Sequence, residues 1–373
     1  MALKKRIWLS PPHMSGNEME YINLAYKTNW VAPLGPNVDG FERDISKLMK
    51  IKHVAALSSG TAAIHLALII LGVKPNDEVI CPSFTFSASA NPICYQNATP
   101  IFIDSEKDTW NMCPELLEKA IKDRLSKGKK LKAIILVHLY GMPAKMDEII
   151  YISNKYNIPI IEDAAEALGS MYKKQYLGTF GNIGIYSFNG NKIITTSGGG
   201  ALVSNNKEYC KQAIFLSTQA RDSAPHYEHS NIGYNYRLSN ILAGIGRGQI
   251  KVLKERVNSR RDKFSYYKKK LESSNISFLN ELNGYFSNRW LTCILTNSYN
   301  IRESIRINLE KENIESRPLW KPMHLQPIFK EYPSYLNGIC ESLFERGLCL
   351  PSGSNLKLAE QDKIIEIILK TMK

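Results

Sequence analysis

Lys192 lies in a small, polar, glycine-rich segment, residues 186–200, between two apolar runs with the composition of strands, residues 183–188 and 201–203. A lysine held between two buried strands is partly desolvated, which disfavours its ammonium form and makes its amine a nucleophile. Such an amine can form a Schiff base with a carbonyl compound. Most lysines are solvated surface residues, so other parts of the chain must decide between the two interpretations.

A second candidate is the segment Ser59-Gly60-Thr61, which connects an apolar run at residues 55–57 to an alanine- and leucine-rich stretch at residues 62–68. Free N–H groups, hydroxyls and the positive end of a helix dipole together make a binding site for phosphate. An ordinary helix N-cap uses the same residue types, and both interpretations stay open at this point.

The third candidate is a pair of acids, Glu162 and Asp163, at the end of the apolar run 158–163. Ligands of open α/β sheets bind at the carboxyl ends of the strands. The candidates that fall at or just beyond such ends are Thr61, Phe86, Tyr140, Asp163 and Lys192. Their convergence on one edge favours a functional lysine over a surface lysine.

The elements that must position these residues alternate in type from about residue 54 to residue 205. The run 131–138 is almost continuously apolar, as expected for a strand buried on both faces of a parallel sheet. The alternation predicts an α/β fold with a mixed, mainly parallel sheet. The expected strands are residues 78–82, 100–104, 131–138 and 158–163, and the expected helices are residues 62–73, 115–127 and 146–157.

The pattern changes after residue 205. A long helical segment, from about 239 to 273, is expected to span two lobes, and a strand at 291–295 belongs to the second lobe. We therefore predict a large domain with an N-terminal arm at residues 1–250 and a small α+β domain at residues 251–373.

A Schiff-base lysine, a strand-end carboxylate and a phosphate cradle together predict a site for pyridoxal 5'-phosphate (PLP). We expect Lys192 to bind the cofactor covalently and Asp163 to keep its pyridine nitrogen protonated. No Gly-x-Gly-x-x-Gly opens an early helix, which argues against a dinucleotide site. The remaining expected contacts are those of the phosphate, at Gly60, Thr61 and Ser187, and of one ring face, at Phe86.

Composition excludes several classes of protein. The chain of 373 residues has no apolar run near the ~18 residues of a membrane span, and Met1 to Ser10 does not resemble a signal peptide.

Its seven cysteines are odd in number and lack Cys-x-x-Cys spacing, which predicts reduced thiols in a cytoplasmic protein. The histidines are scattered, so we expect no metal. The net charge of +13 comes without a nucleic-acid motif, and a lysine-rich solvated surface explains it as well as any function does.

Five motifs resemble those of the DegT-type PLP-dependent sugar aminotransferases of fold type I: residues 59–63, 82–86, 162–169, 187–200 and 233–238. The resemblance covers about residues 8 to 370. It implies an aspartate aminotransferase-like fold and a homodimer with shared active sites, in which Asn235 reaches the PLP phosphate of the neighbouring subunit. Glu166 stands where many members have His or Gln beside the PLP 3-hydroxyl, and a charged carboxylate would repel the oxyanion there.

Residues 9–14, 32–35 and 317–324 resemble a subgroup that aminates UDP-2-acetamido-2,6-dideoxy-4-keto-hexose in the bacillosamine pathway. The resemblance implies a UDP-4-amino sugar as product and L-glutamate as amino donor. Arg317, Lys321 and His324 suit a diphosphate, although packing between lobes would explain each of them equally well. The sugar-nucleotide contacts implied in this way are Pro33, Leu34, Arg317, Lys321 and His324.

Three alternatives are weighed against this function. A dTDP-linked 3- or 4-keto-6-deoxy sugar would need the same core motifs. A related sugar dehydratase carries His at the position of Lys192, so the lysine argues against dehydration. A non-catalytic regulator or nucleic-acid-binding protein would not need Lys192 and Asp163 at strand ends, so these two residues argue against it.

Overall fold

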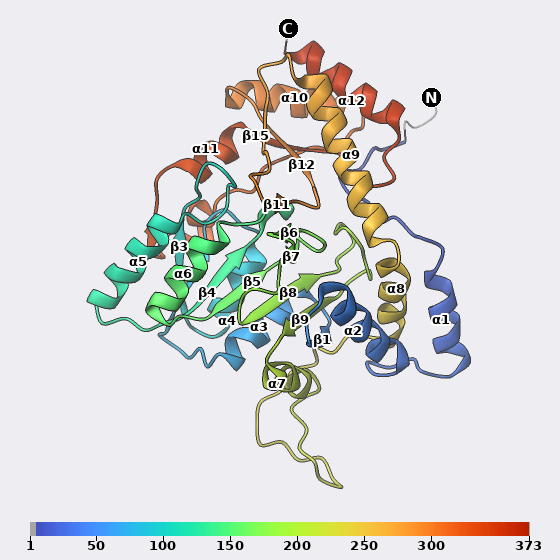
Figure 1. The fold of residues 1–373 in the computed structure, drawn as a ribbon, viewed down its shortest axis with the longest axis vertical. Helices are drawn as coiled ribbons and strands as arrows, with labels where there is room; N and C mark the ends of the chain where they lie inside the picture. Colours follow the sequence, from blue (N-terminus) through green and yellow to red (C-terminus); the bar gives the residue numbers. More distant parts are fainter. Residues whose placement is uncertain (1–4, 373) are drawn as a thin grey trace.

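The computed structural model describes residues 5–372, so the first four residues of the stretch compared with a signal peptide lie outside the described residues. Its centre is an eight-stranded sheet (Figure 1). In spatial order the strands are β1 (His53–Leu57), β9 (Gly200–Ser204), β8 (Ile183–Ser187), β5 (Ile160–Asp163), β4 (Leu131–Val137), β2 (Glu78–Pro82), β3 (Thr99–Ile103) and β14 (Ser334–Tyr335).

The sheet is mixed and mainly parallel, as predicted. β9 runs antiparallel to both of its neighbours, β1 and β8, and all other neighbouring strands are parallel. The segment of Lys192 connects β8 to β9, which confirms its expected place between two strands. The strands are buried along most of their length, because helices cover both faces.

Two groups of helices form the covering layers. One buried apolar cluster joins one face of the sheet to α3 (Gly60–Ile70), α4 (Asn91–Tyr95) and α7 (Lys207–Ser217). The other joins the opposite face to α2 (Pro36–Met49), α5 (Pro114–Ser126), α6 (Met146–Tyr156) and α8 (Asn240–Ile250). α1 (Glu18–Lys27) packs outside α8, and the segment between α7 and α8 projects from the body of the molecule (Figure 1).

A second, smaller lobe lies above the sheet in Figure 1. It contains an antiparallel sheet in the order β10 (Ser277–Phe278), β12 (Thr292–Leu295), β15 (Gly347–Leu350) and β13 (Arg317–Pro318). Four helices accompany it: α9 (Leu253–Leu271), α10 (Tyr299–Lys311), α11 (Ile339–Arg346) and α12 (Leu358–Thr371). The α+β composition expected of this region is therefore present.

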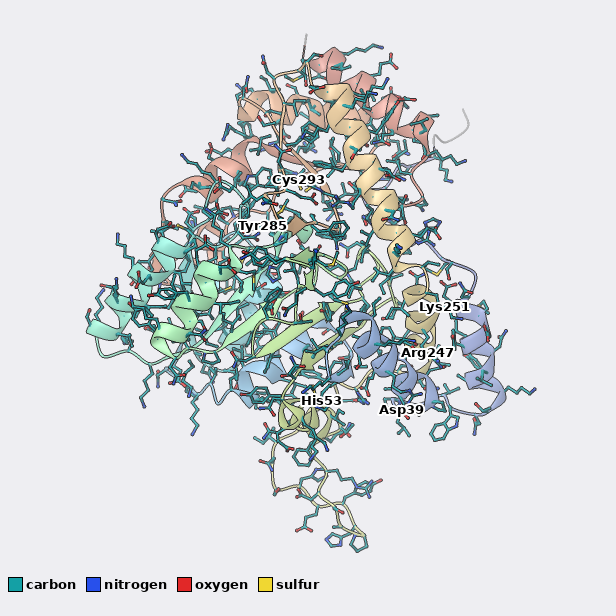
Figure 2. All side chains as sticks on the ribbon, in the orientation of Figure 1. Asp39, His53, Arg247, Lys251, Tyr285 and Cys293 are labelled. Carbon is teal, nitrogen blue, oxygen red and sulfur yellow. The ribbon has the colours of Figure 1, made fainter. Side chains whose placement is uncertain are left out.

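The C-terminal part of the chain adds strands to sheets of the large lobe. β14 comes from the C-terminal part of the chain but pairs with β3, and the buried carboxylate of Asp104 accepts bonds from the amides of Asn337, Gly338 and Cys340. Tyr285 of β11 (Tyr285–Phe286) pairs with β6 (Met171–Tyr172), which is extended by β7 (Gln175–Tyr176), and Figure 2 shows Tyr285 at this boundary. The proposed division at residue 250 thus crosses many contacts.

The single long helix expected at about 239–273 is instead two helices, α8 and α9. The amide of Val252 bonds to the carbonyl of Gln249, three residues back, so the helical register is interrupted there. The glycines of α8 allow close packing, because a Cβ at Gly246 would lie 2.6 Å from Phe41 of α2. α8 is thus bound to the large lobe, and α9 starts afresh toward the small one. Within residues 5–372, no helix combines the length and apolar composition needed to cross a bilayer.

Candidate active site

Lys192 lies in a cavity of about 610 Å³ at the carboxyl ends of β5 and β8. Its side chain is 13% exposed, and its Nζ is 3.8 Å from Oε1 of Glu166 and 4.4 Å from the ring centre of Trp290. The interpretation as a solvated surface lysine is therefore wrong. The amine is enclosed but accessible from the cavity, as a nucleophilic lysine must be.

Asp163 ends β5 and lines the same cavity, with 6% of its surface exposed. Its Oδ2 accepts a 2.7 Å hydrogen bond from Oγ of Ser89, and its Oδ1 accepts a 3.1 Å bond from the amide of Ala165. Two donors on different oxygens fix the orientation of the carboxylate. It can present a negative charge to a protonated ring nitrogen without turning away.

The start of α3 is a capped helix end that also lines the cavity. Ser59 is the N-cap, because its Oγ accepts a 2.9 Å bond from the amide of Ala62. Gly60, Thr61 and Ser187 line the cavity. A Cβ at Gly60 would lie 3.2 Å from Cβ of Ser187, so the glycine keeps this corner open. Helix amides and two hydroxyl side chains thus form a cradle of the kind that binds phosphate.

Glu166 lines the same cavity, with its Oε1 3.8 Å from Nζ of Lys192. Its Oε2 accepts a 2.6 Å bond from the amide of Tyr140, and burial raises the pKa of its carboxyl above the ordinary value. Burial favours the uncharged acid, which can donate a hydrogen bond to an oxyanion. A protonated Glu166 would not repel an oxyanion next to it.

Aromatic side chains form the remaining wall, and composition alone did not identify them as site residues. Trp290 and Trp320 line the cavity, and Nε1 of Trp290 donates a 2.8 Å bond to the carbonyl of Asn191, next to Lys192. Tyr140 lies behind this wall, where its hydroxyl accepts a 2.9 Å bond from the amide of Trp320. Phe86 also lines the cavity, at 58% exposure. The motif 317–324 contains Trp320 and could have identified it. For Trp290 the sequence offered only its position directly before the strand expected at 291–295.

The expected sugar-nucleotide residues divide into two groups. Arg317 and Lys321 line the cavity. His324 does not line it, because one ring nitrogen is 2.7 Å from Oγ of Ser83 and the other is 3.1 Å from Glu341. Pro33 and Leu34 are exposed in the single chain and do not line the cavity. The same holds for Asn235, which was expected to reach the PLP phosphate of the neighbouring subunit.

The residues of the cavity fit PLP. An enclosed amine, an oriented carboxylate, the open start of α3 and the ring of Phe86 line the same cavity. The described part of the chain has no group of three or more His, Cys, Asp or Glu side chains placed to hold a metal ion. The arrangement suits reactions in which the amine of Lys192 forms a Schiff base with a carbonyl group.

Comparisons with known proteins agree with this chemistry. The family model of the DegT/DnrJ/EryC1/StrS aminotransferases matches residues 12–369. EpsN of Bacillus subtilis, named as a pyridoxal phosphate-dependent aminotransferase, is 53% identical over 98% of this chain and 96% of its own length. GDP-perosamine synthase of Escherichia coli O157:H7 is 38% identical over 98% of both chains.

Solved structures give the same assignment. The PLP form of the sugar aminotransferase Spr1654 from Streptococcus pneumoniae superposes with a TM-score of 0.91 at 28% identity, covering 99% of this chain and 100% of that one. The expected fold type I architecture and PLP dependence are thus confirmed. The chain belongs to the DegT/DnrJ/EryC1/StrS aminotransferase family and is a PLP-dependent aminotransferase of nucleotide-linked keto sugars.

Proposed function

We propose that the protein transfers an amino group from L-glutamate to UDP-2-acetamido-2,6-dideoxy-4-keto-hexose, giving the UDP-4-amino sugar. The observation that carries the proposal is the single cavity that brings Lys192 and Asp163 together with Arg317 and Lys321. The first pair belongs to amine chemistry, and the second pair offers cations to a diphosphate. The resemblance of residues 9–14, 32–35 and 317–324 to the UDP-sugar subgroup selects the substrate.

Each residue has a definite task in this reaction. PLP, when bound, supplies the electron sink for both halves of the transfer. Lys192 Nζ accepts the proton from the α carbon of the amino donor, and in the second half it delivers a proton to the sugar carbon that carries the new amine. Asp163 holds the pyridine N–H, and Glu166, when protonated, can donate its O–H to an oxyanion. Trp290 and Trp320 exclude water from the amine.

A second candidate is amination of a GDP-linked keto sugar, which the 38% identity to GDP-perosamine synthase favours. A dTDP-linked 3- or 4-keto-6-deoxy sugar is a third, because the same core residues would serve it. All three share the donor half of the reaction.

The test offers purified protein, PLP and glutamate separately to the UDP-, GDP- and dTDP-linked 4-keto-6-deoxy sugars, with product followed by mass spectrometry. Lys192→Ala is the blank and the exposed Lys173→Ala is the matched control. Turnover confined to the UDP sugar is expected. Turnover confined to the GDP or dTDP sugar would overturn the substrate assignment but leave the amine chemistry intact.

The same proposal includes a homodimer with shared sites and a cytoplasmic location. The exposed apolar residues Met19, Leu24, Tyr26, Val31 and Leu34 cluster on α1 and the turn that follows it, each at least 50% exposed. A second copy that covers this surface would bring Asn235, Pro33 and Leu34 to the neighbouring cavity. All seven cysteines are free, which is in keeping with a reducing compartment.

A further inference from the structure

A second cavity, of about 530 Å³, lies in the small lobe between α9 and residues 280–289, the part of the chain that leads to β12. Most of its lining side chains come from residues 261–272, at the spacing of successive turns on one face of α9. This α9 cavity and the Lys192 cavity share no lining residue in the described part of the chain. The α9 cavity is therefore separate from the site of amine chemistry.

The lining of the α9 cavity carries more positive than negative charge. Its cationic side chains are Arg261, Lys268, Lys269 and Arg289, and its acidic side chains are Glu272 and Glu281. Glu281 is already paired, because both of its oxygens accept bonds from the guanidinium of Arg261. Lys268 donates a 2.8 Å bond to the uncharged amide oxygen of Asn280. Neither lysine forms an ion pair within residues 5–372, so both ammonium charges are available to an anion.

Arg289 is the buried cation of this cavity, with 8% of its side chain exposed. Its guanidinium carbon lies 3.7 Å from the ring centre of Phe264, and one terminal nitrogen donates a 2.6 Å bond to the carbonyl of Leu279. The other terminal nitrogen is 3.7 Å from Oε1 of Glu281, too far for a hydrogen bond. Burial lowers the pKa of Arg289 to about 10. An anion that enters the cavity would supply the charge that this guanidinium lacks.

The spacing of the cations along α9 indicates the kind of anion. Arg289 packs on Phe264, and Lys268 follows Phe264 by four residues, which is about one helical turn or about 6 Å along the axis. Lys269 lies next to Lys268 on the same lining. The cavity thus has two positive centres, and two linked phosphate groups can contact both of them. Charge-assisted hydrogen bonds from arginine and lysine are the usual means of holding such groups.

A run of lysines at the end of a helix has another explanation, because cations there stabilise the helix dipole. Lys268, Lys269 and Lys270 all lie in the last turn of α9. Lys270, however, does not line the cavity, and its ammonium group lies 5.5 Å from the ring centre of Tyr266. The dipole explanation treats Lys269 and Lys270 alike, whereas an anion site distinguishes them.

We propose that the α9 cavity binds a small anion with two linked phosphate groups, either free pyrophosphate or the diphosphate of a nucleotide. One phosphate lies against Arg289 and the other against Lys268 and Lys269. The inference does not depend on which sugar nucleotide the protein aminates. Arg289 directly precedes Trp290, which lines the Lys192 cavity, so an occupant of the α9 cavity contacts the segment that carries one wall of the active site.

The experiment measures binding of inorganic phosphate, pyrophosphate and UDP to the PLP-loaded protein by titration calorimetry. Loss of one hydrogen bond to a charged group is expected to raise the Kd of pyrophosphate about 10- to 150-fold in Lys269→Ala. Lys269→Arg keeps the charge and should keep most of the affinity. Lys270→Ala removes the same charge from the same turn and is the matched control, with an unchanged Kd expected.

A variant of opposite sign strengthens the test. Glu272 is exposed and lines the cavity, so its charge repels an anion there. Glu272→Gln is therefore expected to lower the Kd of pyrophosphate about 2- to 5-fold. Binding at the proposed substrate site is separated by Arg317→Ala, which should leave the Lys269-dependent binding unchanged.

Equal effects of Lys269→Ala and Lys270→Ala, or no Lys269-dependent binding of either pyrophosphate or UDP, would overturn the site. Inorganic phosphate that binds as tightly as pyrophosphate would overturn the assignment of two linked phosphate groups. A lower Lys269-dependent Kd for UDP than for pyrophosphate would support a nucleotide as the ligand, and the reverse order would support free pyrophosphate.

Discussion

Asp163 and Glu166 are three residues apart and line the cavity of one amine, but their surroundings give them different tasks. Asp163 receives hydrogen bonds from Ser89 and Ala165, which suit a charged carboxylate, and it lies where a ring nitrogen must be held. Glu166 is buried against Tyr140 and Lys192, and burial raises the pKa of its carboxyl. Asp163 is thus placed to pair with a protonated ring nitrogen, and Glu166 is placed to donate a hydrogen bond when it is protonated.

The first prediction concerns Asp163→Asn, which keeps the shape of the side chain and removes its charge. A hydrogen bond to a charged group contributes about 1.5–3 kcal/mol, so kcat/KM for the overall transfer should fall about 10- to 150-fold. Steady-state kinetics with glutamate and the keto sugar check this, with the exposed Asp147→Asn as control. Equal rates in Asp163→Asn and the unaltered protein would contradict the assigned task.

The second prediction follows from the raised pKa of Glu166. Because the folded protein binds this proton more tightly than the unfolded chain, the stability contributed by Glu166 is fully present below the ordinary carboxyl pKa. It is lost as the pH rises through the folded pKa. Glu166→Gln does not titrate, so its melting temperature relative to the unaltered protein should rise with pH.

Thermal melts of both proteins between about pH 4 and pH 8, a range that brackets the pKa values of buried carboxyls, measure this difference. Glu148→Gln, on the surface of α6, serves as the control and should show no such trend. A difference that is constant with pH, or that falls, would show that Glu166 is not buried as an uncharged acid.

The sequence predicted the residues of the cavity where chemistry restricts the residue type. A Schiff base needs a lysine and a pyridine nitrogen needs an acid, so Lys192 and Asp163 were recognisable at strand ends. Trp290 and Trp320 were not predicted as walls, because an apolar ring packs in any core. His324 was taken for a diphosphate contact, but its ring bonds to Ser83, 241 residues away in the chain, and to Glu341.

Among the elements, the close approach of β9 to the start of α3 determines the shape of the phosphate cradle. A Cβ at Gly200, the first residue of β9, would overlap backbone atoms of Ser59 and Gly60. Gly200→Ala should therefore push the helix start outward and destabilise the fold by about 1–3 kcal/mol, the usual range for overpacking. It should also weaken retention of PLP.

Urea unfolding and the absorbance of bound PLP after dialysis measure these two effects. Gly190→Ala is the matched control in the same loop region, because the nearest atom to its Cβ would be 4.0 Å away in Pro12. If Gly200→Ala and Gly190→Ala behaved alike, the cradle would not depend on this contact.

The strands of the large sheet up to β9 were predictable because they are short apolar runs that alternate with segments of helical periodicity. The boundary between α8 and α9 was not, because residues 239–273 keep a helical pattern through the break at Val252. Three-dimensional packing of the glycine-containing face of α8 on Phe41 and Tyr21 decides that boundary. The same limit applies to β14, whose two residues have no pattern of their own.

At the scale of the whole molecule, the apolar surface on α1 and the following turn predicts the assembly. Tyr26→Glu combined with Leu34→Glu should produce monomers, since each side chain is at least 55% exposed in the single chain and a charge cannot be buried without a partner. Size-exclusion chromatography with light scattering measures the mass. Leu125→Glu on α5 is the control, and a dimer that survives the double substitution would contradict the proposed interface.

The pairing of β14 with β3 also has a consequence for the chain as it leaves the ribosome. β3 is complete at residue 103, but the strand that covers its outer edge is not made until residues 334–335. During most of translation the sheet therefore presents unpaired N–H and C=O groups at that edge, a template for pairing with other chains. Premature termination before residue 334 should leave a product prone to aggregation, and chaperones that shield strand edges should matter most in this interval.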